Sequence, residues 1–418
     1  MKNIVIIGAG FGGLTVAKEL AEKEFNVTII DKTNHHLFQP LLYQVATAVL
    51  SPADIAIPIR SIFSDFNNVK VLLGEVKLID KKKKKVFFNG TELEFDYLII
   101  ATGSKLSYFG KDEWEKYSPG LKTLNDALKI RENILLALEA AEFEKDPERR
   151  QKYLNFVIIG GGPTGVELAG AISEIVNKNL ISDFRNINAS MTRVYLVEAL
   201  PSVLSSFPEK LSRRALEDLK DLEVELILNE KVTEINESGV KIGERFIESR
   251  NILWAVGNQA LPLIKTLGTA TDKNGRAIVN EDLSIKDAEN IFVIGDAAAV
   301  KNEKGEYLPP LAPVAIQQGK FVAKIIAGDS NGKLHGQFKY KDRGTMATIG
   351  KAKAVAVIKG FKLTGFVAWL AWSFIHILFL ISFRSKIRVM SEWIWHYLTN
   401  RPGIRLIVKY TNDQLVKS

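Results

Sequence analysis

The sequence predicts an α/β protein with two similar strand–turn–helix units and a helical segment near its C-terminal end. Three observations support this class: a glycine-rich turn begins at Gly8, a second begins at Gly160, and an apolar stretch follows Lys362. The two turns start 152 positions apart (160 − 8), and repetition of a whole unit is harder to obtain by chance than one glycine triad. We therefore expect two Rossmann-like dinucleotide-binding domains, and hence two nucleotides.

The first unit occupies the first 31 residues. Lys2–Ile7 is a short apolar run of the kind that forms a buried strand, and Leu14–Lys23 is expected to be a helix. The intervening glycines allow a sharp turn, close approach of a pyrophosphate and tight packing of the helix on the strand. Asn26–Asp31 is the next expected strand, and the Asp31 carboxylate, 18 positions after Gly13, can accept hydrogen bonds from a ribose.

Further strands are expected between the two glycine-rich turns. Val69–Leu73, Glu75–Asp80 and Lys85–Phe88 have strand character, and the lysine run 81–85 is expected at a solvated hairpin tip. Phe95–Gly103 is typical of a buried parallel strand, and the small residues at its end leave room for a cofactor. The periodicity of 124–144 predicts a helix.

The second unit repeats the pattern of the first. A strand at Phe156–Ile159 leads into the second turn, a helix is expected over Val166–Asn177, and the strand Arg193–Glu198 ends in an acid. Glu198 lies 33 positions after Gly165, and the loop-like segment 182–190 can absorb the surplus. A carboxylate there would repel a 2′-phosphate, which favours NADH over NADPH. Two later strands end at Gly257 and at Gly295-Asp296.

Composition excludes several kinds of redox and metal chemistry. The chain has no cysteine, so disulfides, thiolate nucleophiles and iron–sulfur clusters are excluded, and redox chemistry must come from a bound cofactor. His35 and His36 are adjacent, but the other three histidines lie far away in sequence, so we expect no metal site. No secretion signal is visible, and the catalytic part is expected to be cytosolic.

The C-terminal region is basic and apolar. Residues 384–418 contain seven Lys or Arg against two acids, a net +5 of the total +8, and interleaved aromatics favour a membrane surface over nucleic acid. Leu363–Phe383 carries no formal charge over 21 residues; as a helix it would be about 31 Å long. Ile387, Met390, Ile394 and Leu398 follow at helical spacing. We expect two helices lying in one leaflet; a span at 363–383 and a buried dimerisation helix are the alternatives.

Three motifs carry a family resemblance. Phe38–Ala46, Gly160–Glu167 and Ala312–Gly319, followed by the hydrophobic C-terminal segment, resemble the type II (alternative, non-proton-pumping) NADH dehydrogenases of the two-dinucleotide-binding-domain flavoprotein superfamily. The resemblance implies a homodimeric flavoenzyme that transfers a hydride from NADH to tightly bound FAD and two electrons on to menaquinone or ubiquinone. It also implies peripheral attachment to the cytoplasmic face of the cell membrane, with no nucleic acid partner.

The resemblance also assigns domains and site residues. It implies a first FAD-binding part (1–112), an NADH-binding domain (113–290), a second FAD-binding part with the quinone motif (291–360) and membrane-anchoring helices (361–418). FAD contacts are expected at Gly8, Gly10, Phe11, Gly12, Gly13, Asp31, Lys32, Gln44, Thr47, Val76, Ala101, Thr102, Gly103 and Asp296. NADH contacts are expected at Gly160, Gly161, Gly162, Pro163, Thr164, Gly165, Glu198 and Gly257, and quinone contacts at Gln317 and Gln318. Glu167 and Gln317 are the expected catalytic residues.

Two questions stay open at the level of sequence. Glu167 is either a proton donor whose pKa is raised in a semi-apolar cleft, or a helix N-terminal acid whose pKa is lowered by the macrodipole. The function itself has two alternatives, a soluble diaphorase-like NADH:acceptor reductase and a flavin-bearing interaction protein that senses NADH.

Overall fold

The structure is a computed structural model that describes residues 1–179, 181–329, 336–399 and 403–407. The chain forms two compact units, one of 1–37, 56–106 and 258–342 and one of 38–55, 107–257 and 343–418. Each unit contains one glycine-rich turn. The expected boundaries after residues 112, 290 and 360 divide the chain by cofactor, and that division stays a prediction. The tail residues Arg401, Lys409, Asp413 and Lys417 lie outside the described residues.

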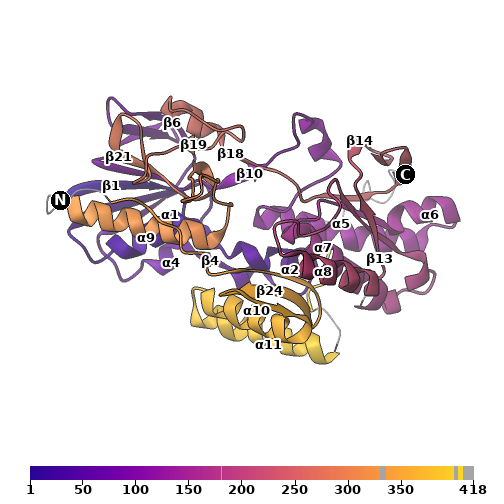
Figure 1. Cartoon of the computed structure of the whole chain (residues 1–418). Coiled ribbons are helices and arrows are strands. Elements are labelled where there is room, and N and C mark those ends of the chain that lie inside the picture. Colours follow the sequence, from indigo (N-terminus) through magenta and orange to yellow (C-terminus); the bar gives the residue numbers. More distant parts are fainter. Residues whose placement is uncertain (180, 330–335, 400–402, 408–418) are drawn as a thin grey trace. The chain divides into compact units, whose positions relative to one another are not determined.

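The first unit is built on a six-stranded sheet in the order β20-β21-β9-β1-β2-β5. Neighbouring strands are parallel except for β20 and β21. Helices α1 (Phe11–Leu20) and α9 (Ala312–Asp329) pack against each other, with α9 in orange in Figure 1. The strands are β1 (Lys2–Ile7), β2 (Phe25–Asp31), β5 (Val69–Leu73), β9 (Tyr97–Ile100), β20 (Ser284–Ile285) and β21 (Ala288–Val293).

Smaller elements complete the first unit. An antiparallel meander consists of β6 (Val76–Asp80), β7 (Lys85–Phe88) and β8 (Thr91–Glu94), and its hairpins confirm the strands expected there. Short pairs form between β3 (His35–Leu37) and β4 (Ala56–Pro58), between β10 (Ser104–Leu106) and β18 (Asn258–Ala260), and between β19 (Ala277–Ile278) and β22 (Ala298–Ala299). Helix α4 (Ile59–Ile62) follows β4.

The second unit contains a four-stranded parallel sheet in the order β13-β12-β11-β17. Its strands are β11 (Asn155–Ile159), β12 (Arg193–Glu198), β13 (Val224–Leu228) and β17 (Asn251–Trp254), and a second meander is β14 (Val232–Asn236), β15 (Gly239–Ile242) and β16 (Arg245–Glu248). The helices before the C-terminal region are α2 (Leu42–Ala46), α3 (Pro52–Ile55), α5 (Leu124–Phe143), α6 (Pro147–Leu154), α7 (Pro163–Glu174) and α8 (Glu209–Asp221). Strand β11 is buried along its whole length, as its apolar sequence predicts.

The helices that follow the two glycine-rich turns, α1 and α7, begin earlier than expected. Helix α1 starts at Phe11 and not at Leu14, and α7 starts at Pro163 and not at Val166. In both cases the glycine before the helix is its N-cap, so the glycine-rich turn itself forms the first helical turn. Proline suits this position because its missing N–H would have no helical partner there. Helix α7 then continues as a π-helical turn through Ile175–Asn179.

The C-terminal region of the second unit is a three-stranded antiparallel sheet, β23 (Thr345–Gly350), β24 (Lys353–Ile358) and β25 (Phe361–Thr364), followed by α10 (Gly365–Phe379) and α11 (Phe383–Thr399). Figure 1 draws both helices in yellow beside β24. The expected helix over 363–383 is wrong in length, because β25 takes its first residues and the chain leaves the helical conformation at Leu380. Helix α10 is therefore about 22 Å long. Among the described residues no helix is both long and apolar enough to cross a bilayer.

Candidate functional site

The first glycine-rich turn is a cradle at the carboxyl ends of β1 and β2. Gly8 N donates to Ile30 O at 2.8 Å, which fixes the turn against β2. A Cβ on Gly13 would lie 1.9 Å from Gly8 O, so only glycine lets α1 pack this closely. In contrast, a Cβ on Gly10 would meet no atom within 4 Å, because the space before the helix is open. An open helix N-terminus is a binding site for a diphosphate.

Asp31 both ends β2 and holds this turn. Its Oδ2 accepts a hydrogen bond from Ala9 N at 2.7 Å, and its Oδ1 accepts from the backbone N and the hydroxyl of Thr33 at 2.7 and 2.8 Å. A carboxylate offers about four acceptor positions, so one stays available to a ribose hydroxyl. The role in fastening the turn was not predicted from the sequence.

Strand β9 and the Gly295-Asp296 turn supply polar groups to the same unit. Thr102 Oγ1 is buried and has no hydrogen-bond partner among the described residues. Asp296 Oδ2 accepts from Ser104 Oγ at 2.7 Å, and Gln318 Oε1 accepts from Gly295 N at 2.6 Å. A buried hydroxyl without a partner is what a site for a polar ligand presents, because such groups are otherwise satisfied.

His36, one of the two adjacent histidines, is part of the cradle through its contacts. Its Nδ1 lies 2.8 Å from Ala9 O, its ring meets the Phe11 ring edge-on at 5.2 Å, and its buried Nε2 has no partner in the described part of the chain. Burial lowers the pKa of His36, so the ring is neutral at physiological pH. The unpartnered Thr102 and His36 atoms, the open Gly10 and the Asp31 carboxylate together fit an adenine dinucleotide.

The other expected FAD residues divide between the two units. Ala101, Gly103, exposed Lys32 and buried Val76 belong to the first unit, whereas Gln44 and Thr47 belong to the second. Gln44 and Thr47 are buried there, in a pocket described below. Their assignment to FAD stays a prediction.

The second glycine-rich turn is built like the first. A Cβ on Gly165 would lie 1.7 Å from Gly160 O, and a Cβ on Gly162 would meet no atom within 4 Å. Glu198 at the end of β12 accepts from Gly161 N at 2.6 Å and from Leu200 N at 2.9 Å, so this acid also fastens its turn. Of the remaining expected NADH residues, Pro163 and Thr164 form the first helical turn, and Gly257 follows β17 with a positive φ of 76°.

A pocket in the second unit lies between α2, α7, β23, α10 and α11. Its polar wall contains Tyr43, Gln44 and Thr348, and Trp369, Trp372 and Trp393 supply flat apolar surface. Trp393 Nε1 donates to Gln44 Oε1 at 2.7 Å, and Gln44 Nε2 donates to the Tyr43 hydroxyl at 2.8 Å, which ties α11 to α2. Flat aromatic walls with a few fixed polar groups suit a planar ring that carries oxygen atoms.

Glu167 faces this pocket from the fifth position of α7. Burial raises its pKa from 4.5 to about 8, and a hydrogen bond from the Thr348 backbone opposes the rise. The macrodipole acts mainly within the first turn, and α7 has no acid there, so the hypothesis of a lowered pKa is wrong. The raised pKa leaves this carboxyl group largely protonated at neutral pH, as a proton donor must be.

Several pocket residues were not predicted. Glu174, Lys351 and His396 line the pocket with Glu167, and burial raises the pKa of Glu174 and of Tyr43 while it lowers that of His396. Only the spacing of Glu174, seven positions after Glu167, could have indicated that it shares a helix face with a predicted residue. The other residues come from segments far apart in the sequence.

The expected quinone residues Gln317 and Gln318 lie on α9 in the first unit. Gln317 exchanges two hydrogen bonds of 3.0 Å with the Lys341 backbone, its Nε2 donating to O and its Oε1 accepting from N. Gln318 is buried and holds the Gly295-Asp296 turn. Among the described residues no group of three His, Cys, Asp or Glu side chains could hold a metal.

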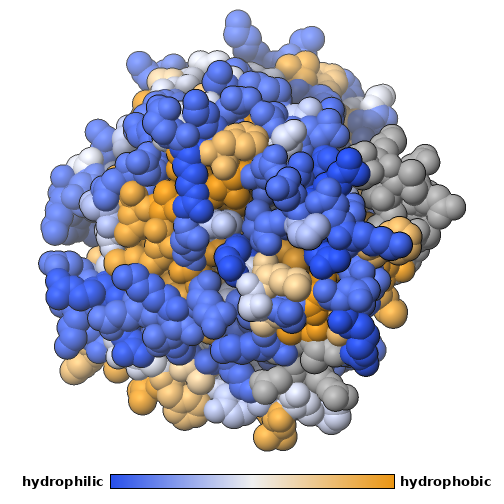
Figure 2. Space-filling model, turned by 90° about the vertical axis from the view of Figure 1, so that its right-hand side faces the viewer, coloured by the Kyte–Doolittle hydropathy of each residue, from blue (hydrophilic) through white to orange (hydrophobic). Residues whose placement is uncertain are grey.

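The outer faces of α10 and α11 are apolar and exposed. Phe374 is 63% exposed and Leu398 75%, and the inner faces are buried through Trp372 and Trp393. Figure 2 shows hydrophobic side chains along the lower rim of the molecule, at the level where Figure 1 draws these helices. The other large exposed apolar residues of the two helices are Phe366, Val367, Leu370, Leu378, Phe379, Phe383, Ile387, Met390, Ile394, Trp395 and Tyr397.

Known protein families match both the N-terminal three quarters of the chain and its C-terminal region. Residues 2–319 match the pyridine nucleotide-disulphide oxidoreductase family, and residues 343–402 match the NDH2 C-terminal domain. Two type II NADH:quinone oxidoreductases of Mycobacterium tuberculosis are 41% and 42% identical, over 96% and 94% of this chain and 89% and 86% of their own. The fold is similar to that of NDH2 from Plasmodium falciparum in complex with NADH, with a TM-score of 0.89 at 22% identity, covering 98% of this chain and 100% of that one.

Proposed function

The chain belongs to the type II NADH:quinone oxidoreductases, and from this premise we propose which of its residues bind FAD, NADH and quinone and how it meets the membrane. The enzyme oxidises NADH and reduces a quinone by two electrons. The observation that carries the assignment of sites is the pair of matching cradles, each with an open glycine before a helix and a strand-end acid bonded to the turn.

FAD is assigned to the first cradle. Gly10 and the N-terminus of α1 bind the diphosphate, Asp31 binds the ribose of the adenosine, and Asp296 binds the ribityl chain. Thr102 and His36 offer polar atoms that have no partner among the described residues. When bound, FAD supplies the two-electron chemistry that a chain without cysteine lacks. Lys32 and Val76 are further proposed contacts in the same unit, and the expected FAD contacts at Gln44 and Thr47 stay predictions.

NADH is assigned to the second cradle. Gly162 and the N-terminus of α7 bind its diphosphate, and Glu198 binds the ribose. Because Glu198 is a fixed carboxylate that accepts two backbone N–H groups, a 2′-phosphate would be repelled, and NADPH is the poorer substrate. Gly257 is a further proposed contact, in a turn where a Cβ would lie 2.8 Å from Ser107 O.

Quinone is assigned to the pocket of Tyr43, Glu167 and Trp393. The expected quinone contacts at Gln317 and Gln318, in the other unit, stay predictions. The indole rings form flat walls for the quinone ring. Glu167 donates a proton to a quinone oxygen, and its burial keeps it protonated for that purpose. Menaquinone and ubiquinone both have the ring that this pocket would take.

The exposed faces of α10 and α11 attach the enzyme to one leaflet. Their apolar side chains would enter the headgroup region, and Arg384 and Lys386 would meet anionic lipid. Attachment from the cytoplasmic side would let a lipid-soluble quinone reach the pocket, whose walls include both helices. A homodimer is proposed on the family resemblance alone.

The experiment that tests this function separates its two halves under anaerobic conditions. NADH is expected to bleach the yellow FAD absorbance, and a short-chain quinone is expected to restore it faster than oxygen does. Glu244→Gln, in an exposed turn, is the matched control and should behave like the wild type. A colourless protein after reconstitution with FAD, or a bleached flavin that quinone does not reoxidise, would contradict the proposal.

A further inference from the structure

The pocket wall formed by α7 carries two carboxylates. Glu174 lies seven residues, two helical turns, after Glu167, so both project from one face about 10 Å apart along the helix. Ala171 lines the pocket between them. The helix surface beyond Glu174 reaches solvent at exposed Lys178. Both carboxyl groups line the pocket, and Glu174 is the one closer along the helix to exposed Lys178.

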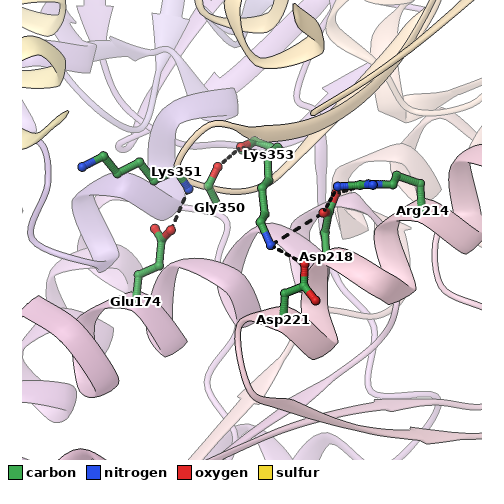
Figure 3. Close-up of polar contacts among 8 residues, drawn as sticks. Glu174, Arg214, Asp218, Asp221, Gly350, Lys351 and Lys353 are labelled. Carbon is green, nitrogen blue, oxygen red and sulfur yellow. Dashed lines mark hydrogen bonds and ion pairs between the residues drawn. The ribbon is translucent and has the colours of Figure 1, made fainter. Parts of the chain in front are cut away.

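A backbone amide holds the Glu174 carboxyl group, and no side chain among the described residues forms an ion pair with it. Its Oε1 accepts a hydrogen bond from Lys351 N at 2.7 Å, and Figure 3 shows the Lys351 ammonium extending away from it. That ammonium donates to Tyr397 O at 2.6 Å and lies 4.6 Å from the centroid of the Tyr397 ring. The amide holds the carboxyl group in place without requiring it to be charged.

The turn that presents this amide is tightly fixed. Lys353 Nζ lies 2.8 Å from Asp221 Oδ2 and 3.7 Å from Asp218 Oδ1, and the fully buried Asp218 side chain also binds Arg214 at 2.7 Å (Figure 3). A Cβ on Gly350 would lie 2.9 Å from Glu174 Oε1 and 2.8 Å from Leu222 Cδ1, so a larger residue there would displace the ends of both side chains. These contacts tie the β23–β24 turn to α8 and fix the position of Glu174.

The groups that face Glu174 leave it able to exchange a proton. Burial raises its pKa, and the Lys351 amide and the charges of Lys178, Lys351 and Lys353 oppose the rise. From α2, the buried Tyr43 hydroxyl faces it, and burial raises the pKa of that hydroxyl well above its usual value. From α11, His396 lines the same pocket with a lowered pKa.

The reaction requires one proton from water for each quinone reduced. NADH + H⁺ + quinone gives NAD⁺ + quinol, and the hydride supplies two electrons and one of the two protons of the quinol. We propose that Glu174 takes the second proton from water and passes it to Glu167, which donates it to a quinone oxygen. Glu167 then regains its proton from Glu174, and Glu174 regains its proton from water, so neither carboxyl group is consumed. Water in the pocket would bridge the distance between them.

This inference rests on the proposed quinone site, and Glu174→Gln tests it separately. Glutamine can still accept the Lys351 N–H bond but cannot carry a proton. We expect bleaching of the flavin by NADH to stay as in the wild type, and reoxidation by a short-chain quinone to slow by roughly tenfold or more. The slowing should grow as pH rises. Because the two carboxyls act in series, Glu167→Gln/Glu174→Gln should be no slower than Glu167→Gln alone.

Two further variants separate proton transfer from support of the turn. Lys353→Met breaks the ion pairs that fix the same turn, so it should lower the melting temperature. Loss of its charge lets the pKa of Glu174 rise further, so the pH profile of reoxidation should move to higher pH while the rate at low pH stays that of the wild type. Glu174→Asp retains a titratable group and should recover part of the rate, and it serves as the test if the Gln variant does not fold. Wild-type reoxidation in Glu174→Gln, additive losses in the double variant, or a Glu174→Asp variant that is no faster than Glu174→Gln would overturn the relay. A wild-type enzyme that reduces no quinone would instead refute the proposed function.

Discussion

Replacement of Glu167 by glutamine should make the protein more stable and less active. The pKa of this carboxyl is about 8 in the folded chain against 4.5 for an exposed glutamate. At neutral pH the folded chain therefore holds a proton on the Glu167 carboxyl group that the unfolded chain has released. Such a group weakens the fold as pH rises from about 4.5, and the loss levels off once pH passes about 8.

The size of the effect follows from these two values. Each tenfold change in proton affinity corresponds to about 1.4 kcal/mol, so at about pH 7 the penalty reaches about 3 kcal/mol as an upper value. Glutamine has a similar shape and no such penalty. Thermal unfolding of the FAD-loaded wild type and Glu167→Gln, followed from about pH 5 to about pH 9, should show melting temperatures that coincide at low pH. At neutral pH the variant should melt higher, by roughly 5 °C.

The same preparations should differ in quinone reduction. Loss of a general acid typically costs a factor of about 100 or more, so reoxidation by quinone should fall steeply while bleaching by NADH does not. Glu244→Gln, the exposed control, should match the wild type in both assays, because its side chain is hydrated in both states. Equal melting temperatures of wild type and Glu167→Gln across the pH range would refute the reasoning from burial.

Three further predictions concern the cradles and the membrane face. Gly165→Ala places a Cβ 1.7 Å from Gly160 O and should abolish NADH binding in a protein that stays yellow, whereas Gly13→Ala places a Cβ 1.9 Å from Gly8 O and should lose FAD. Absorbance measures bound FAD and titration measures NADH binding, and a colourless Gly165→Ala variant would count against separate cradles. Glu198→Ala should reduce the preference for NADH over NADPH by roughly tenfold, read as the ratio of kcat/KM values, and an unchanged ratio would remove Glu198 from coenzyme selection. Phe374→Glu should weaken flotation with anionic liposomes by roughly tenfold or more, whereas Phe143→Glu, on exposed α5, should not, and equal losses would contradict attachment through α10 and α11.

The cradles could be predicted from the sequence because their requirements are local. Gly13 and Gly165 contact the turn that directly precedes them, and Asp31 and Glu198 end strands whose bounds the apolar runs define. Even so, the hydrogen bonds from both acids to the glycine turns were missed. A strand-end acid looks the same in sequence whether it binds ligand, backbone or both.

The proposed quinone pocket could not be predicted in the same way. It joins Tyr43, Glu167 and Trp393, which are separated by more than a hundred residues from one neighbour to the next, and no local pattern records their contact. The C-terminal helix was expected to be longer because hydropathy does not register the break at Leu380, where the backbone turns extended without proline or glycine. The strands β23–β25 were missed, although Gly350 and Gly360 punctuate an alternating apolar pattern there.

The most direct test of the account is a structure of the FAD-loaded enzyme with a short-chain quinone. We expect the quinone ring between the Glu167 carboxyl and the indole of Trp393, with one quinone oxygen within hydrogen-bond distance of Glu167. A quinone bound with every atom outside the pocket of Tyr43, Glu167 and Trp393 would contradict it.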